Sequence, residues 1–202
     1  ILSFLTVYLL NRPGKPSRET SEINRKQMET NEDSVIVQRA KKFIKTGKNK
    51  QALKELAKYH ESNNKADLSY LPLYAGLLIT EGESVLRAKR LLEQVLSSSS
   101  RPKIKSQAHL WLGYLLLSED EADMGESHFL EALQLNPKDP AATFNLGRAY
   151  LRQEKYQQAL EYFQLAELDL PNFWLIHIYS GWAKSSLKLN EEANKAFKLA
   201  VS

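Results

Sequence analysis

Apolar residues recur through most of this chain at the three- and four-residue spacing that places them on one face of a helix. Ala159, Phe163 and Ala166 are an example of this spacing. No segment alternates apolar and polar residues between turn dipeptides, as a half-buried strand would. Gly and Pro are also few, at eight and seven in 202 residues. The pattern therefore predicts an all-helical chain without a sheet.

The N-terminal residues depart from this pattern. Residues 1–10 are mostly apolar, but a membrane-spanning helix needs roughly 20 such residues. Polar residues with two Pro and a Gly follow directly. We interpret residues 1–10 as the distal part of a transmembrane helix or signal anchor, and residues 11–32 as a flexible linker. A short apolar helix packed on the rest of the chain is the alternative for residues 1–10.

The strongest pattern in the chain is a repeat of 34 residues. Three columns of residues recur at this spacing, and two Pro close successive repeats. These residues are Gly113, Gly147 and Gly181; Phe129, Phe163 and Phe197; Ala132, Ala166 and Ala200; and Pro137 with Pro171. Three columns in phase at one period indicate a repeated supersecondary unit.

The clearest unit resembles the tetratricopeptide repeat. It carries, in the order typical of that family, Leu146, Gly147, Tyr150, Ala159, Phe163, Ala166 and Pro171. Thr143 departs from the family pattern, which usually has Trp at this position. The resemblance implies an all-α fold in which each unit is a pair of antiparallel helices. About five units would stack into a right-handed superhelical solenoid with a concave inner surface.

The resemblance divides residues 33–202 into five units. Their ranges are 33–66, 69–105, 106–139, 140–173 and 174–202. The first two units match less closely. They are recognised by small and apolar residues at equivalent places, which are Ala40, Ala52 and Leu56 with Gly47 in the turn, and Gly76, Ala88, Leu92 and Val95.

The resemblance also implies which residues line a concave, peptide-binding groove. They are Tyr70, Leu73 and Leu77 in the second unit; Leu110, Tyr114 and Leu117 in the third; Phe144, Arg148, Leu151 and Arg152 in the fourth; and Ile178 and Trp182 in the fifth. This mostly apolar lining predicts a protein partner that offers an amphipathic helix or an extended apolar peptide. The alternative is a closed groove whose side chains pack on one another. Family members that bind chaperone C-termini use Lys and Asn at two positions of the repeat. This chain has Leu73 and Leu77, Leu110 and Tyr114, or Phe144 and Arg148 at those positions, so that ligand is not expected.

No residue pattern predicts catalysis, a cofactor or a metal site. The chain has no Cys, and it lacks a Gly-rich phosphate loop, an HExxH motif and a Gly-x-Ser-x-Gly motif. His109 and His177 occupy the same position two units apart, so they are expected to pack rather than to share a metal. We therefore expect a non-enzymatic protein.

Positive charge is concentrated near the N-terminus. Residues 1–65 contain 14 Lys or Arg and 7 Asp or Glu, whereas residues 66–202 contain 14 and 17. Much of the excess comes from Arg39, Lys41, Lys42, Lys45, Lys48, Lys50, Lys54 and Lys58. This stretch is either a solvated face or a surface for anionic lipid headgroups. Too few aromatic residues lie between the cations for nucleic-acid binding to be expected.

These features predict a membrane-anchored adaptor that acts within a multiprotein complex. By analogy of fold, the expected place is a single-pass protein of a bacterial inner membrane. Arg12, Lys15 and Arg18 favour a cytoplasmic repeat domain, but an upstream flank would also count, so the side stays open. The alternatives are a structural subunit of a large envelope or membrane assembly that packs through its repeat surfaces, and a nucleic-acid binder that uses the basic first units.

The register of the repeat predicts the packing of individual residues. Gly147 should face the second helix of its own unit, and Phe163 should lie in the core. Phe144 and Trp182 occupy groove positions, so both are expected to be partly exposed. Replacing either of these two with Ala should therefore cost less stability than replacing Phe163.

Overall fold

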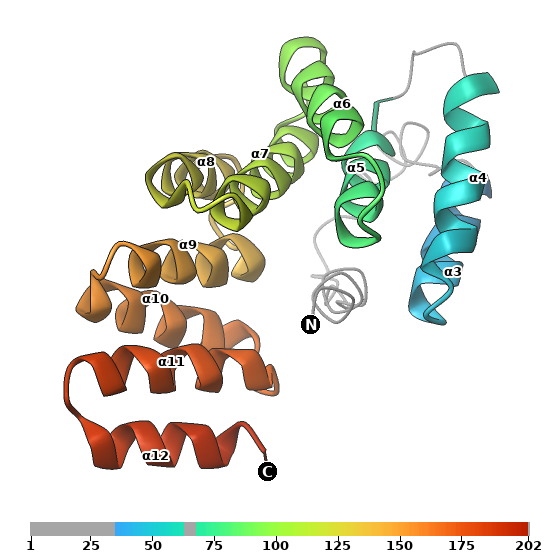
Figure 1. The fold of residues 1–202 in the computed structure, drawn as a ribbon. Helices are drawn as coiled ribbons and strands as arrows, with labels where there is room; N and C mark the ends of the chain where they lie inside the picture. Colours follow the sequence, from blue (N-terminus) through green and yellow to red (C-terminus); the bar gives the residue numbers. More distant parts are fainter. Residues whose placement is uncertain (1–34, 63–67, 202) are drawn as a thin grey trace, which may run out of the picture. The chain divides into compact units, whose positions relative to one another are not determined.

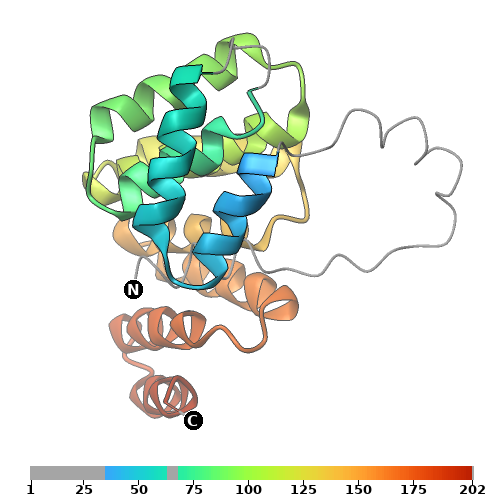
Figure 2. The same ribbon diagram turned by 90° about the vertical axis from the view of Figure 1, so that its right-hand side faces the viewer.

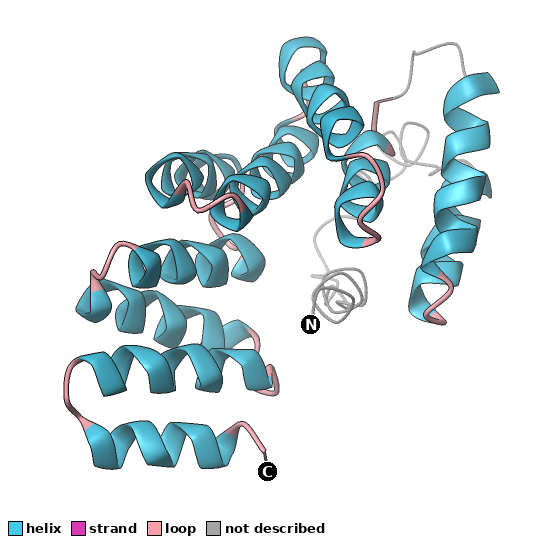
Figure 3. Cartoon of the chain, viewed as in Figure 1, coloured by secondary structure: helices cyan, strands magenta, loops and turns pink. Residues whose placement is uncertain are grey.

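The fold was analysed in a computed structural model that describes residues 35–62 and 68–201. Within these ranges the regular structure is entirely α-helical, with ten helices and no strand (Figure 3). The predicted anchor at residues 1–10 and the predicted linker at 11–32 lie outside the described residues. The all-helical prediction is confirmed for the part of the chain that is described.

The helices follow one another in pairs along the chain (Figure 1). The first helix of a pair is called helix A below, and the second is called helix B. The pairs are α3 (Val35–Lys45) with α4 (Asn49–Ser62), α5 (Leu71–Thr80) with α6 (Val85–Ser98), α7 (Pro102–Ser118) with α8 (Ala122–Leu135), α9 (Pro140–Arg152) with α10 (Tyr156–Asp169), and α11 (Trp174–Ser186) with α12 (Asn190–Leu199). Four of the pairs lie inside one of the five repeat intervals proposed from the sequence, whereas α7 begins at Pro102, four residues before the proposed start of the third interval.

The chain divides into two compact units, one up to Leu91 and one from Leu92 onward. In the first unit α3 packs on α4 and α4 contacts α5. Val37, Ile44 and Leu56 are at most 1% exposed and form the core between α3 and α4. This core leaves the lysines of both helices on the solvent side.

In the second unit, successive helices from α7 to α12 pack on one another, as both views show (Figures 1 and 2). Helix A of one pair also contacts helix A of the next, since α7 touches α9 and α9 touches α11. Three consecutive A helices therefore form one continuous layer. Such a layer is what stacked hairpins create on their inner side.

The repeated Gly and Phe residues meet inside each pair of the second unit. A Cβ atom placed on Gly147 would lie 2.7 Å from Cε1 of Phe163, and one on Gly113 would lie 2.7 Å from Cε1 of Phe129. Gly181 has the same relation to the ring of Phe197. Helix A thus needs a residue without a side chain at this place, because the aromatic ring of helix B occupies the space. The predicted position of Gly147 against helix B is confirmed.

The turn between helices A and B has the same backbone conformation in all five pairs. One residue in each turn has a positive φ, and these residues are Gly47, Gly82, Asp120, Glu154 and Lys188, with φ between 60° and 71°. Gly adopts this conformation without strain, whereas other residues carry a cost. The first two turns therefore avoid a strain that the last three accept.

The start of α9 illustrates how the local sequence defines a boundary. The side chain of Asp139 accepts hydrogen bonds from the backbone N–H groups of Ala141 at 3.0 Å and Ala142 at 3.4 Å. Pro140 follows at the first helical position, where no N–H donor is needed. The Asp139-Pro140 dipeptide thus defines the start of α9, directly after the turn that ends the previous repeat.

None of the helices in residues 35–62 and 68–201 combines the length and the apolar character that crossing a membrane requires.

Candidate functional site

Arg148 of α9 lies where the three A helices of the second unit meet. Its guanidinium carbon is 5.7 Å from the ring centroid of Tyr114 on α7 and 5.1 Å from that of Tyr179 on α11. A third ring, that of Phe144, is 6.0 Å away. These distances are those of cation–π contacts, which stabilise a positive charge that is partly removed from water. Three successive repeats thus hold one cation on the layer of A helices.

The hydrogen bonds of Arg148 fix its position but do not neutralise its charge. Its Nη1 donates to Oδ1 of the buried Asn145 at 2.7 Å, and Nδ2 of Asn145 donates to the carbonyl of Ala141 at 2.8 Å. Its Nε is buried and has no acceptor. No carboxylate lies within ion-pair distance of Arg148 among the described residues. The guanidinium is therefore held in place and still lacks an anionic partner.

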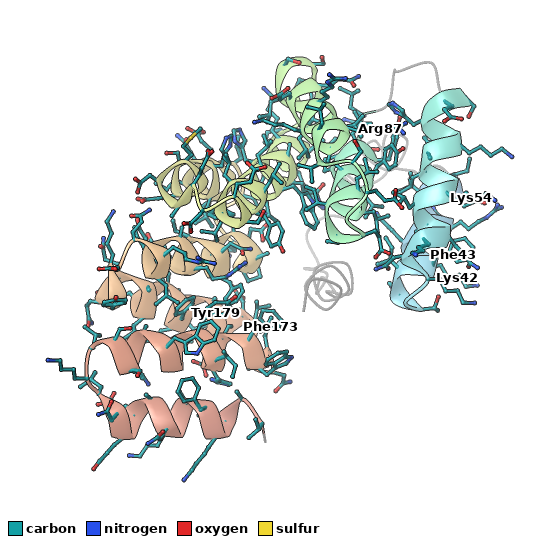
Figure 4. The ribbon with its side chains drawn as sticks, in the orientation of Figure 1. Lys42, Phe43, Lys54, Arg87, Phe173 and Tyr179 are labelled. Carbon is teal, nitrogen blue, oxygen red and sulfur yellow. The ribbon has the colours of Figure 1, made fainter. Side chains whose placement is uncertain are left out.

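An exposed indole is connected to this cation through the ring of Tyr179. Trp182 is 50% exposed, and its ring contacts Tyr179 edge to face, with the centroids 5.0 Å apart. Tyr179 in turn packs against Phe144 at 5.5 Å and also lies over Arg148. Figure 4 labels Tyr179 and Phe173 on the side of α11 that faces α9 and α10. A rigid aromatic base thus supports Trp182 and leaves half of it in water.

The predicted groove residues in the compact unit from Leu92 onward separate into a buried and an accessible group. Leu110, Tyr114, Leu117 and Phe144 are all no more than 7% exposed. Arg148, Leu151 and Ile178 are half-buried, and Arg152 and Trp182 are exposed. We call the set Arg148, Leu151, Arg152, Ile178 and Trp182 the helix-A face. This surface is narrower and more basic than the sequence indicated.

The expected exposure of Phe144 is wrong. The side chain is only 1% exposed, because the rings of Phe163, Phe173 and Tyr179 surround it at centroid distances of 5.8, 5.2 and 5.5 Å. Its position in the repeat was read correctly, since Arg148 stands over it one turn later. A large aromatic ring at this place fills the space between adjacent A helices instead of projecting from them. The expected exposure of Trp182 is confirmed.

The three groove residues predicted in the second repeat, which lies largely in the compact unit up to Leu91, are mostly buried. Tyr70 is 2% exposed and Leu77 is fully buried, whereas Leu73 is half-buried. The Tyr70 hydroxyl is 2.8 Å from Nδ1 of His60, and its ring contacts Tyr59 edge to face at 4.9 Å. These contacts give Tyr70 a structural role in holding α5 against α4.

The chemistry that the helix-A face offers is that of binding. The phenol of Tyr114 beside Arg148 is neutral at physiological pH, because burial raises its pKa above the usual value near 10. No group of three or more His, Asp or Glu residues in the described segments is arranged to hold a metal ion. The face offers an apolar ring surface, which can pack on a side chain, and a fixed guanidinium, which can donate hydrogen bonds to a carboxylate.

Comparison with known proteins places the fold. A sequence profile described as a tetratricopeptide repeat matches residues 122–172, from the start of α8 to the turn that follows α10. A solved structure described as MamA 41-end from Desulfovibrio magneticus RS-1 covers 83% of this chain and 92% of its own, with a TM-score of 0.63 and 20% identity. The chain has the tetratricopeptide-repeat fold. The predicted all-α solenoid of such repeats is confirmed.

Two further matches agree with this fold. A crystal structure of MamA covers 80% of this chain and 92% of its own, with a TM-score of 0.61 and 20% identity. In sequence, Superkiller protein 3 of Schizosaccharomyces pombe is 32% identical over 92 residues, which is 46% of this chain. That match spans only 7% of the yeast protein, so the similarity concerns a few repeats.

The contact between His109 and His128 was not predicted from the sequence. Nδ1 of His109 on α7 lies 2.9 Å from Nδ1 of His128 on α8, and the ring centroids are 5.2 Å apart. One ring must donate and the other accept, so at most one of the two facing nitrogens carries a proton. The two residues lie 19 positions apart and share no motif. Only the contact between α7 and α8 reveals them.

This pair should make the stability of the repeat domain depend on pH. Burial, and secondarily the charge of His128 and Lys105, lowers the pKa of His109 below its usual 6.5, while Glu131 opposes the shift. The unfolded chain then binds a proton more readily than the folded one, so the free energy of unfolding should fall as the pH drops below about 6.5. Thermal melting at pH 7.5 and pH 5.5 measures this loss. A His109→Asn variant cannot titrate and should lose less, and an equal loss in both proteins would contradict the assignment.

Proposed function

We propose that this chain is a non-enzymatic scaffold that binds a segment of a partner protein along the helix-A face and is held at a membrane by its N-terminal residues. The observation that carries the binding part is the exposure of Trp182, whose ring packs on Tyr179, the same ring that Arg148 contacts. Phe144 lies in the same layer but is only 1% exposed, and the other exposed indole of α11, that of Trp174, is 38% exposed. A half-exposed indole on a rigid aromatic base is the kind of residue that dominates protein interfaces.

Site-specific photo-crosslinking in the native cell tests the binding surface. A photoreactive amino acid at position 182 or 152 should attach covalently to the bound partner. The matched control is position 157, because Gln157 is exposed on α10, the helix B that follows Arg152. Cross-links at 182 and 152 that are absent at 157 support the proposal, whereas equal products at all three positions, or none at any, contradict it.

A Trp182→Ala substitution separates binding from folding. Since half of the indole is in water, its loss should lower the free energy of unfolding by only about 1 kcal/mol, well below the cost for a fully buried ring. The same substitution should remove most of the cross-link formed from position 152, because a hot-spot aromatic residue is lost. Chemical denaturation and the cross-link yield measure the two effects. An unchanged cross-link yield would show that Trp182 is not part of the interface.

The membrane part of the proposal is supported by charge as well as by the apolar residues 1–10. Lys42 and Lys45 on α3 and Lys50, Lys54 and Lys58 on α4 are all exposed, and Figure 4 labels Lys42 and Lys54. The last three repeat every four residues and so follow one face of α4. We call them the α4 lysine row. Arg39 on α3 forms an ion pair with Glu55 on α4, at 3.4 Å. Each Lys near an anionic bilayer adds about 1 kcal/mol of attraction.

Vesicle flotation of the 202-residue chain tests this part. The chain should float with phosphatidylcholine vesicles through residues 1–10, and more strongly when phosphatidylglycerol is added. Changing all three residues of the α4 lysine row to Gln should reduce only the additional binding, because the charge is lost and the apolar segment is kept. Deletion of residues 1–10 should abolish binding to the neutral vesicles. Undiminished binding by the deleted protein would contradict the anchor.

A second function is favoured by exposed leucines on the B helices. Leu165 and Leu199 occupy the same repeat position on α10 and α12 and are 53% and 58% exposed, and Leu168 is 81% exposed. Exposed apolar side chains in one row mark a contact with another protein surface. A structural subunit that packs through these helices would self-associate. Analytical ultracentrifugation decides between the two functions, because an adaptor should sediment as a monomer without its partner.

A further inference from the structure

The charges of helices α7 to α11 are sorted by helix, whereas α12 has two Glu and two Lys. The A helices α7, α9 and α11 contain five Lys or Arg residues and no Asp or Glu. The B helices α8 and α10 contain six Asp or Glu residues and no Lys or Arg. The two layers of the same repeats therefore differ in the sign of their charge. Folding alone does not require this division, since polar residues of either sign suit a solvated helix face.

The cations of the helix-A face differ in how they are compensated. Arg152 forms an ion pair with Asp120 at 3.2 Å, but both side chains are largely exposed, at 61% and 82%. Such a pair is weak and easily exchanged. Arg148 has no carboxylate partner among residues 35–62 and 68–201, is half-buried, and has a buried Nε without an acceptor. A guanidinium in this state gains more from an arriving carboxylate than a solvated one does.

We propose that the helix-A face selects an acidic segment of the partner protein, in which an Asp or Glu pairs with Arg148 while a neighbouring large apolar side chain packs on Trp182. This inference rests on the proposed function and names the chemistry of its partner. The rings of Tyr114, Phe144 and Tyr179 hold the guanidinium in one orientation before binding. Little side-chain entropy is then lost when the carboxylate arrives.

A nucleic acid fits this surface less well than an acidic protein segment. A phosphate backbone needs several cations along its path. The helix-A face has two, and one of them is already paired with Asp120. The six carboxylates of α8 and α10 belong to the same repeats and would repel a long polyanion. A single carboxylate within an apolar segment meets the guanidinium without that penalty.

Selection from a phage library of random 16-residue peptides against the 202-residue chain tests the inference. The recovered peptides should be enriched in Asp or Glu next to large apolar residues. An Arg148→Gln variant should select peptides without the acidic enrichment, and a Trp182→Ala variant should select peptides without the apolar enrichment. For a synthetic copy of the best peptide, Arg148→Gln should raise the dissociation constant about tenfold or more, since a charge-assisted hydrogen bond is lost.

The α4 lysine row provides the control, because it attracts acidic peptides for a different reason. Changing its three residues to Gln should leave both the enrichment and the affinity of the best peptide unchanged. If the acidic enrichment instead persists in Arg148→Gln and disappears in the lysine variant, the inference is overturned. Peptides selected without acidic residues overturn it as well but leave the scaffold function standing. Recovery of no peptide contradicts the proposed function itself, and tighter binding of a fluorescent oligothymidine than of the best peptide would assign the face to nucleic acid.

Discussion

A Phe163→Ala variant is expected to lose about 3–5 kcal/mol of unfolding free energy, and a Phe144→Ala variant is expected to lose a similar amount. Both rings are at most 1% exposed, and their centroids are 5.8 Å apart. Removing either ring leaves a cavity between α9, α10 and α11 that the remaining side chains cannot fill. Urea denaturation followed by circular dichroism measures the loss.

Trp182→Ala is the matched control for these two variants, because it also removes an aromatic ring from the layer of A helices. Its cost should be clearly smaller, since the indole is 50% exposed. A Phe144→Ala variant that resembled Trp182→Ala would mean that Phe144 does not lie within the aromatic cluster. The two buried rings should also show non-additive effects in a double variant, because they share one cavity.

A Gly147→Leu variant is expected to lose at least about 1–3 kcal/mol of unfolding free energy, as overpacked cores do. A Cβ atom at this position would lie 2.7 Å from the ring of Phe163 and 3.2 Å from the carbonyl oxygen of Ala159. The ring of Phe144 packs against that of Phe163, with the centroids 5.8 Å apart, and so opposes a shift of the Phe163 ring. The leucine would therefore push α10 away from α9. Thermal melting of the variant beside Gln157→Leu, which adds the same side chain to an exposed position of α10, measures the effect.

Combining the two substitutions shows whether Gly147 and Phe163 truly oppose one another. In the Phe163→Ala background the space of the ring is empty, so a leucine at 147 should fill part of it. The double variant is then expected to be more stable than the sum of the two single losses predicts. Simple additivity would mean that the two residues do not touch, and the 34-residue register would be wrong.

The sequence allowed the fold to be predicted because the repeat multiplies each signal. One Gly and one Phe in a helix mean little, but Gly113, Gly147 and Gly181 in phase with the Phe column define which helix faces which. The contact of each Gly with the Phe of its own pair is the physical basis of that column. Where the column is weaker, in the first two pairs, the helices are still bounded by a turn residue with positive φ.

The candidate surface could be predicted only in part. Register alone places Phe144 and Trp182 at inner positions of consecutive repeats, but it does not say how far each side chain projects. That depends on neighbours far apart in sequence, since Phe173 and Tyr179 cover Phe144 and leave Trp182 open. The His109–His128 pair was missed for the same reason. The separation of charge between A and B helices, by contrast, could be counted in the sequence once the helix bounds were known.

The rings of Tyr114, Phe144 and Tyr179 fix the position of Arg148 relative to Trp182, and this arrangement bears on the direction in which a segment binds. Arg148 and Trp182 occupy the same place in consecutive repeats, 34 residues apart, yet one offers a charge and the other an apolar ring. Because these two equivalent positions differ in chemistry, the two ends of the surface are not interchangeable. A bound segment can therefore satisfy both points in only one of its two directions, with its acidic residue toward α9 and its apolar residue toward α11. Exchanging the two side chains would keep the composition of the face and reverse the direction in which the partner lies.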